Sequence, residues 1–263
     1  MKISIYQVDA FAAKVFEGNP AAVCPLGHWL DDELLQKIAA ANNLSETAFI
    51  VPGENNGEQG IELRWFTPKG EVDLCGHATL ASAHVLYQHL GFNEPEIRFK
   101  SRSGELRVTK VSQGYCLDFP ASASRDTPPP MALLAGLTIT PTAVLAGTDY
   151  LVVLSNEEEV KNLTPDYAAW YNLDLRGVIV TAPGNEVDFV SRCFYPKYRV
   201  NEDPVTGSAH CQLAPYWQAR LNRKVLTAKQ LSERTGQLTC ELKGDRVLLT
   251  GGAADYMAGE INL

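Results

Sequence analysis

A short motif occurs twice in this chain, and the two copies lie about half a chain length apart. Residues 66–72 read Phe-Thr-Pro-Lys-Gly-Glu-Val, and residues 194–200 read Phe-Tyr-Pro-Lys-Tyr-Arg-Val. Each copy leads into a segment of small residues, near Gly76 in the first half and near Gly207 in the second. An internal repeat of this kind indicates a duplicated structural unit. We therefore expect two pseudo-symmetric lobes, residues 1–122 and 123–263, with the C-terminal strand able to complete the first lobe.

Hydrophobic periodicity predicts short strands with a few helices between them, on both sides of a proline-rich linker at residues 122–130. Strands are expected at 2–11, 47–51, 61–66, 96–100, 105–111, 115–119, 141–146, 151–154, 178–182 and 188–194, with three more between 237 and 263. Helices are expected at 31–41, 78–90 and about 207–221. This succession predicts an α+β protein.

Composition and charge argue against several classes of protein. The chain is 45% hydrophobic, carries a net charge of −8 and has no basic run, which argues against nucleic-acid binding. No apolar stretch approaches the ~18 residues of a membrane span. The six cysteines are dispersed and form no zinc-finger pattern, which is typical of reduced thiols in the cytoplasm. Nucleotide-binding and HExxH motifs are missing, which argues against chemistry that depends on NAD or ATP.

Small residues at the heads of two predicted helices suit the binding of an anion. First-turn amides have no helical partner and carry the positive end of the helix dipole. Small side chains at Gly76 and Gly207 would let a carboxylate approach these amides closely. If both helix heads face one cleft, they would hold a small anionic molecule between the two lobes.

Glu46 is a lone acid among apolar neighbours, with Leu44 before it and Ala48 and Phe49 after it. It is either a capping or solvated loop charge, or a partly buried carboxylate that serves as general acid and base near neutral pH. The residues around it leave both interpretations open.

Cys75 and His77 flank the start of the first small-residue helix. A cysteine at a helix N-terminus can be activated as a thiolate with help from a histidine, although most free cysteines are buried small hydrophobic groups. His84 follows His77 at a spacing that does not suit a metal pair, so a packed or surface histidine is expected. Asp203 precedes a proline and is either a helix cap or a substrate-binding carboxylate. The Gly-Asn-Pro turn at Asn19 by itself predicts only a turn.

Taken together, these segments resemble the phenazine-biosynthesis PhzF-like proteins. The resemblance rests on Val8-Asp9-Ala10-Phe11, Gly18-Asn19-Pro20, Leu44-Ser45-Glu46-Thr47, Gly76-His77 and residues 202–209, Glu-Asp-Pro-Val-Thr-Gly-Ser-Ala. It implies a fold like that of diaminopimelate epimerase, with two pseudo-symmetric lobes that each form a mixed β-barrel around a central helix. It also implies a homodimer that needs no metal or organic cofactor.

The resemblance assigns roles to single residues. In characterised members the glutamate that corresponds to Glu46 moves a proton between two carbons of a cyclic hydroxy-amino acid, and the site histidine and aspartate correspond to His77 and Asp203. The implied substrate-binding residues are Asn19, Cys75, Gly76, Thr206, Gly207 and Ser208. The implied activity is a cofactor-independent isomerisation of a small carboxylate-bearing molecule.

Two other functions are compatible with such a fold. An amino-acid epimerase would use Cys75 as one base, but two-thiol enzymes need a second cysteine, and the second copy offers Asp203 with no thiol until Cys211. A non-catalytic binding protein would keep the fold alone. The presence of Glu46, His77 and Asp203 together argues against that alternative.

Overall fold

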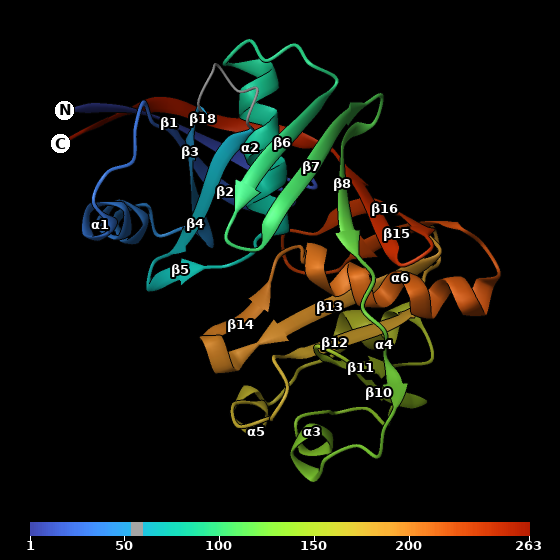
Figure 1. Ribbon diagram of the computed structural model, residues 1–263. Helices are drawn as coiled ribbons and strands as arrows, with labels where there is room; N and C mark the ends of the chain where they lie inside the picture. The colour runs from blue at the N-terminus through green and yellow to red at the C-terminus, as the bar shows by residue number, and fades with distance from the viewer. Residues whose placement is uncertain (54–59) are drawn as a thin grey trace. The chain divides into compact units, whose positions relative to one another are not determined.

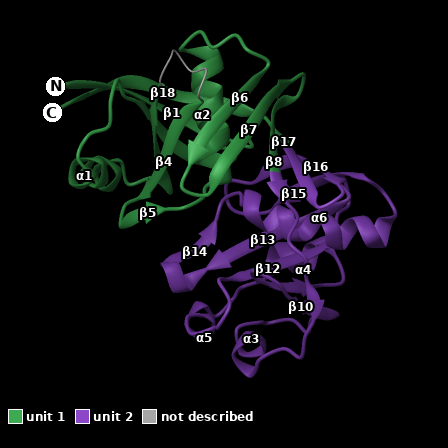
Figure 2. Cartoon of the chain, viewed as in Figure 1, with its two compact units in different colours: residues 1–118, 250–263 green, residues 119–249 purple. Residues whose placement is uncertain are grey.

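The computed structural model describes residues 1–53 and 60–263, which form two compact units (Figure 2). The first unit comprises Met1–Asp118 and Thr250–Leu263, and the second comprises Phe119–Leu249. The sequence placed the division between residues 122 and 123 and allowed the C-terminal strand to complete the first lobe. The units of the structure divide after Asp118 and again after Leu249, so the C-terminal residues return to the first unit.

The first unit is a mixed sheet with two helices (Figure 1). Its elements are β1 (Lys2–Ala10), β2 (Asn19–Pro25), α1 (Asp32–Asn42), β3 (Glu46–Val51), β4 (Ile61–Thr67), β5 (Gly70–Val72), α2 (Gly76–Gln88), β6 (Glu96–Ser101), β7 (Gly104–Val111), β8 (Gly114–Pro120) and β18 (Ala253–Asn262). The strands pair in the order β18–β1–β2–β3–β4–β6–β7–β8. The β2–β3 and β4–β6 pairs are parallel because a helix lies between their strands in the chain, and the other pairs in this order are antiparallel.

The second unit contains shorter strands and several short helices. Its elements are β9 (Arg125–Asp126), α3 (Met131–Ala135), β10 (Ala143–Ala146), β11 (Tyr150–Val153), α4 (Glu157–Asn162), α5 (Tyr167–Trp170), β12 (Val178–Pro183), β13 (Phe189–Tyr195), η1 (Pro196–Tyr198), β14 (Val200–Asp203), α6 (Gly207–Leu221), β15 (Val225–Gln230), β16 (Gly236–Lys243) and β17 (Arg246–Gly251). Here the pairing order is β9–β10–β11–β12–β13–β15–β16, with parallel pairs at β11–β12 and β13–β15.

The two units share one topology. Over the first six strand pairs, the sequence of antiparallel and parallel neighbours is the same in both. The repeated motif lies at equivalent places, since Phe66 is on β4 and Phe194 on β13, and each strand is followed by a short antiparallel partner and then a long helix. The predicted α+β fold with a duplicated lobe is therefore confirmed.

A buried helix occupies the middle of each unit. All residues from 77 to 86 of α2 are buried, and the helix contacts β1, β2 and β3 (Figure 1). Alanines in this helix let the strands approach closely. Its buried hydroxyls, Thr79 and Ser82, donate hydrogen bonds to the carbonyl groups of Cys75 and Ala78 one turn earlier. Burying these hydroxyls away from water therefore costs little free energy. Among the described helices, none is long and apolar enough to cross a membrane.

The proline-rich segment is fastened to the central helix of the second unit. Pro215 lies inside α6, and a proline there leaves the carbonyl of Cys211 without its helical N–H partner. The N–H group of Ser122 takes that place, with an N···O distance of 2.9 Å. Farther along the same segment, β9 pairs with β10. The expected linker at residues 122–130 is thus an ordered part of the second unit.

Several predicted boundaries are corrected by the structure. Helix α2 runs from Gly76 to Gln88 and not from 78 to 90, with His89 as its C-cap, and β3 begins at Glu46 and not at 47. No element was predicted for β5, β9, β14, β15, η1 and the three helices α3, α4 and α5. These helices span four to six residues, which is too short for a helical stripe to be recognised.

Candidate active site

Glu46 is the first residue of β3 and follows a tight turn out of helix α1. Asn43 caps the helix in the left-handed region at φ 50°, which reverses the chain. The side-chain amide of Asn42 donates a hydrogen bond of 3.1 Å to the hydroxyl of Thr47, which ties the helix end to the strand start. Parallel pairing sets Glu46 opposite Ala21 on β2, and β3 is buried from Thr47 onward. Because 18% of its side chain is exposed, Glu46 is not the solvated loop charge of the first interpretation.

The imidazole of His77 lies against the Glu46 carboxylate. His77 is in the first turn of α2, its side chain is 7% exposed, and its Nε2 is 3.1 Å from Oε2 of Glu46. This oxygen is buried and has no aligned hydrogen bond within the described residues, so the contact is an ion pair. A carboxylate and an imidazole therefore face each other with little access for water.

Cys75 completes the cluster from the N-cap position of α2. Its Sγ is 3.4 Å from Nδ1 of His77, and the residue is buried. Burial raises the pKa of the Cys75 thiol to about 11, and the negative charge of Glu46 adds to the rise. Cys75 is therefore a neutral thiol at neutral pH and a weak nucleophile in that form.

The neighbours of His77 set its charge. Burial lowers its pKa, but the neighbouring Cys75 and Glu46 side chains outweigh burial and hold the pKa well above 6.5. The cluster therefore brings together a carboxyl group, an imidazole whose surroundings favour its protonated form and a thiol, which is suited to taking up and returning a proton.

The same three side chains have the spacing of metal ligands. The ligand atoms of Glu46, Cys75 and His77 all lie within 4.8 Å of one another. Carboxylate, imidazole and thiolate are all ligands of zinc. To serve as a ligand, however, Cys75 would have to lose a proton that its surroundings hold tightly.

Asn19 begins β2 in the same unit and is fully buried. The turn before it requires glycine, because Gly18 has φ 67° and a Cβ there would lie 2.2 Å from the carbonyl oxygen of Ala10. The Gly-Asn-Pro signal is thus explained by the backbone. A role for Asn19 in substrate binding stays a prediction.

The second unit gathers its own predicted residues around the head of α6. The carboxylate of Asp203 accepts a hydrogen bond from the hydroxyl of Thr206, the N-cap residue. Gln230 on β15 accepts from the N–H of Thr206 at 2.9 Å and donates to the carbonyl of Asp203 at 2.7 Å. Gly207 and Ser208 follow as the first two residues of the helix. Sequence reasoning missed Gln230, since a single buried glutamine on a strand forms no motif.

At the N-termini of α2 and α6, the first-turn amides lack a capping side chain from the N-cap residue, as the prediction of carboxylate binding requires. The side chains of Cys75 and Thr206, the N-cap residues of α2 and α6, make no capping hydrogen bond to the first turn. The first-turn amides are thus not satisfied by the residues that most often satisfy them. This supports the prediction of an anion-binding site at the N-terminus of each helix, which stays a prediction.

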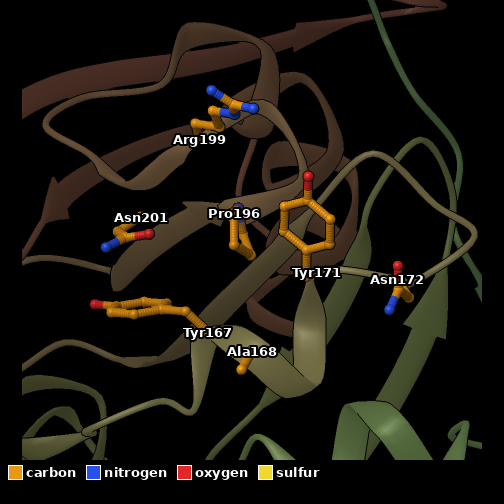
Figure 3. Close-up of a pocket in the computed structure, with 7 residues that line it drawn as sticks. All are labelled: Tyr167, Ala168, Tyr171, Asn172, Pro196, Arg199 and Asn201. Carbon is orange, nitrogen blue, oxygen red and sulfur yellow. The ribbon is translucent and has the colours of Figure 1, made fainter.

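A pocket on the second unit lies apart from these residues. It is formed by α5, η1 and the start of β14, with Tyr167, Tyr171, Pro196, Arg199 and Asn201 among its lining residues (Figure 3). None of the predicted site residues lines it. It therefore has no part in the candidate site.

Comparison with known proteins identifies the family. The family model described as "Phenazine biosynthesis-like protein" matches residues 8–259. An uncharacterised isomerase of Pseudomonas aeruginosa is 52% identical over 263 residues, with 100% of both chains covered. A phenazine biosynthesis-like domain-containing protein of Homo sapiens is 39% identical, with 99% of each covered. The chain belongs to the phenazine biosynthesis-like family, and its relationship to these proteins makes it an enzyme of the isomerase class.

Solved structures agree with this assignment. A PhzF-family protein of Enterococcus faecalis matches with a TM-score of 0.96 and 50% identity over 100% of both chains. A hydroxyproline epimerase of Agrobacterium vitis matches with a TM-score of 0.64 at 9% identity, covering 99% of this chain and 92% of that one. The second likeness shows a common fold alone, and this is the epimerase-like fold that the sequence predicted.

Proposed function

We propose that this protein is an isomerase in which Glu46 takes a proton from one carbon of the substrate and returns it to another. The substrate would be a small carboxylate-bearing molecule of the amino acid or hydroxy acid type. The observation that carries the proposal is the pairing of the Glu46 carboxylate with the His77 imidazole at 3.1 Å, in a setting nearly closed to water.

The proposed proton transfer needs only groups of this chain. The C–H proton passes to Glu46, and the electron pair of the broken bond stays on the substrate beside its carboxylate. Amides at the head of α2, from Gly76 and His77, are suited to bind that carboxylate and the charge that develops near it. The His77 imidazolium orients Glu46, and the protonated Glu46 then delivers its proton to the second carbon.

We also propose that groups of the second unit bind the substrate. Asp203, Thr206, Gly207 and Ser208 would supply a carboxylate, a hydroxyl and helix-head amides for its polar groups. The hydrogen bond between Thr206 and Asp203 supports this part, because it holds that carboxylate in place. Asp203→Asn should raise KM more than it lowers kcat if the residue binds, and should lower kcat if it takes part in proton transfer.

Isotope exchange tests the proton transfer. The protein is incubated in heavy water with a panel of amino and hydroxy acids, and deuterium uptake at carbon is followed by mass spectrometry. Glu46→Gln keeps the size and polarity of the side chain but removes its titrating group, so exchange should fall by about 10²–10⁴-fold. Glu33→Gln is the matched control, because Glu33 is an exposed residue of α1 whose ion pair with Lys37 lies at the surface. Full exchange by Glu46→Gln would contradict the proposal.

A second variant distinguishes the thiol-based alternative from proton transfer by Glu46. Cys75 is buried with a pKa of about 11, so a role as the base is disfavoured. Cys75→Ala should therefore retain exchange within about tenfold of the parent protein, whereas loss of a catalytic base would cost about 10²–10⁴-fold. If Cys75→Ala abolishes exchange and Glu46→Gln does not, the protein is a cysteine-based epimerase.

We further propose that the protein is a homodimer, as the family resemblance implies, and that it is cytoplasmic, as its dispersed cysteines indicate. Light scattering coupled to size-exclusion chromatography should give twice the chain mass of 28.8 kDa. A mass equal to one chain would contradict the dimer.

A further inference from the structure

A second cluster of metal-type ligands lies at the far end of α2 from His77. His84 is on the buried face near the helix end, His89 is the C-cap residue, and Asp255 is on β18. The Nε2 atoms of His84 and His89 lie 3.1 Å and 2.9 Å from the same oxygen, Oδ1 of Asp255. All three residues belong to the first unit, although Asp255 is 171 positions from His84 in the sequence.

Neighbouring side chains hold both imidazoles in position. The hydroxyl of Tyr115 lies 3.0 Å from Nδ1 of His84, and Gln88 donates to the same hydroxyl at 3.3 Å. The ring of His89 stacks on Tyr6, with 4.6 Å between ring centroids and 27° between ring planes. At metal sites, a hydrogen bond to the second ring nitrogen of a histidine sets its tautomer and the direction of its ring. Tyr115 supplies this contact to His84.

The spacing of the carboxylate oxygen from each of the two nitrogens is close to that of zinc ligands. Bonds of about 2.0–2.1 Å at tetrahedral angles put neighbouring ligand atoms about 3.3–3.4 Å apart. The two nitrogen–oxygen distances here are 2.9 Å and 3.1 Å, within a few tenths of an ångström of this value, and all three ligand atoms lie within 4.8 Å of one another. Side-chain exposures of 28% for His89 and 46% for Asp255 leave a path for the ion and for a water ligand.

We propose that His84, His89 and Asp255 form a binding site for a divalent transition-metal ion of the zinc type. Two imidazole nitrogens and one carboxylate oxygen favour zinc, copper and nickel over magnesium or calcium, which prefer oxygen ligands. The ion links the C-terminal end of α2 to β18 and leaves one position for water. Its function is to fasten the C-terminal segment to the first unit, and this is independent of proton transfer at Glu46.

Cobalt titration of the untagged protein tests the site. Co²⁺ is the probe because its visible absorption reports the coordination geometry. The parent protein should bind one equivalent, while His89→Ala and Asp255→Asn should lose it. His28→Ala is the matched control, since His28 is an exposed histidine outside the cluster, and it should bind like the parent. Tyr115→Phe removes only the hydroxyl behind His84 and should weaken binding by about 10–100-fold.

The outcomes that would overturn the site are distinct. A sulfur-to-cobalt charge-transfer band that disappears in Cys75→Ser would place the ion at the other cluster. The site would also be overturned if His89→Ala and Asp255→Asn both still bound one full equivalent of Co²⁺ and had circular dichroism like that of the parent. Lack of Co²⁺ binding by the parent protein would overturn it as well. In support, Zn²⁺ should raise the thermal midpoint of the parent and of His28→Ala but not that of His89→Ala, because an ion that binds the folded state stabilises it.

Discussion

Burial of the His77 imidazole beside Glu46 links the proposed proton chemistry to the stability of the fold. Two residues far apart in the chain meet because a helix head and a strand start converge in the first unit. Removing one partner of a buried ion pair leaves the other charge unpaired, which is costly. Stability and pH are therefore coupled at this site.

We expect the stability that His77 contributes to depend on pH. Its pKa is held above the 6.5 of the unfolded chain, so the contribution is fully present below pH 6.5 and is lost as the pH rises through the folded-state pKa. The difference in unfolding free energy between the parent and His77→Gln should therefore be largest in mild acid and shrink toward alkaline pH. Urea unfolding at a series of pH values measures it. In a Glu46→Gln background the dependence should flatten, and an unchanged slope there would show that Glu46 is not the partner.

The glycine before Asn19 offers a second test at the residue scale. Gly18→Ala would strain a backbone at φ 67° and push a Cβ against the carbonyl oxygen of Ala10. The left-handed conformation alone costs about 1–2 kcal/mol for an alanine, so we expect a loss of at least ~2 kcal/mol in unfolding free energy. Gly27→Ala is the control, because its Cβ would meet nothing within 4 Å. Equal stability of the two variants would contradict the account of this turn.

At the scale of elements, α2 carries the candidate site at one end and the proposed metal site at the other. Leu80 is fully buried in this helix, so Leu80→Ala should leave a cavity and cost about 2–5 kcal/mol. Leu90, just beyond the helix, is 44% exposed, and Leu90→Ala should change stability by at most about 0.5 kcal/mol. Denaturant unfolding of the two variants measures the contrast. Similar losses would mean that α2 is not the central packed element.

At the scale of the whole molecule, the first unit is built from both ends of the chain. β18 pairs with β1 along nine residues, from Lys2 with Asn262 to Ala10 with Ala253. The second unit is continuous in sequence and does not include β18. Loss of the C-terminal residues should therefore affect the two units differently.

Truncation after Leu249 tests this expectation by hydrogen exchange. We expect amides of β1 to lose protection, because the strand loses its partner, while amides of β12 and β13 stay protected. Removal of Leu263 alone is the control, since its N–H group makes one terminal hydrogen bond to Met1. Equal loss of protection in both units would show that they do not behave as separate compact bodies.

Much of this fold could be predicted from local sequence, because strand alternation and helix caps are local properties. The helix expected at 207–221 is α6, and the strands around the two motif copies lie where periodicity placed them. Observed boundaries differ from the predicted ones by one or two residues where helix capping decides them. One example is the start of β3 at Glu46, shortly after Asn43 ends α1 in the left-handed conformation. The short helices α3 to α5 owe their existence to packing in the core of the second unit, which no local pattern records.

Local patterns in the chain are enough to predict the duplication, the α+β class and the candidate residues, since these patterns are the same in any conformation. Tertiary structure decided which side chains meet. Glu46 and His77 come within 3.1 Å because β3 and the head of α2 converge, and His84, His89 and Asp255 meet because the C-terminal strand pairs with the N-terminal one. Charge follows from those contacts, because burial and neighbouring charge set the pKa values of Cys75 and His77. Spacing along the chain carries no record of such long-range proximity.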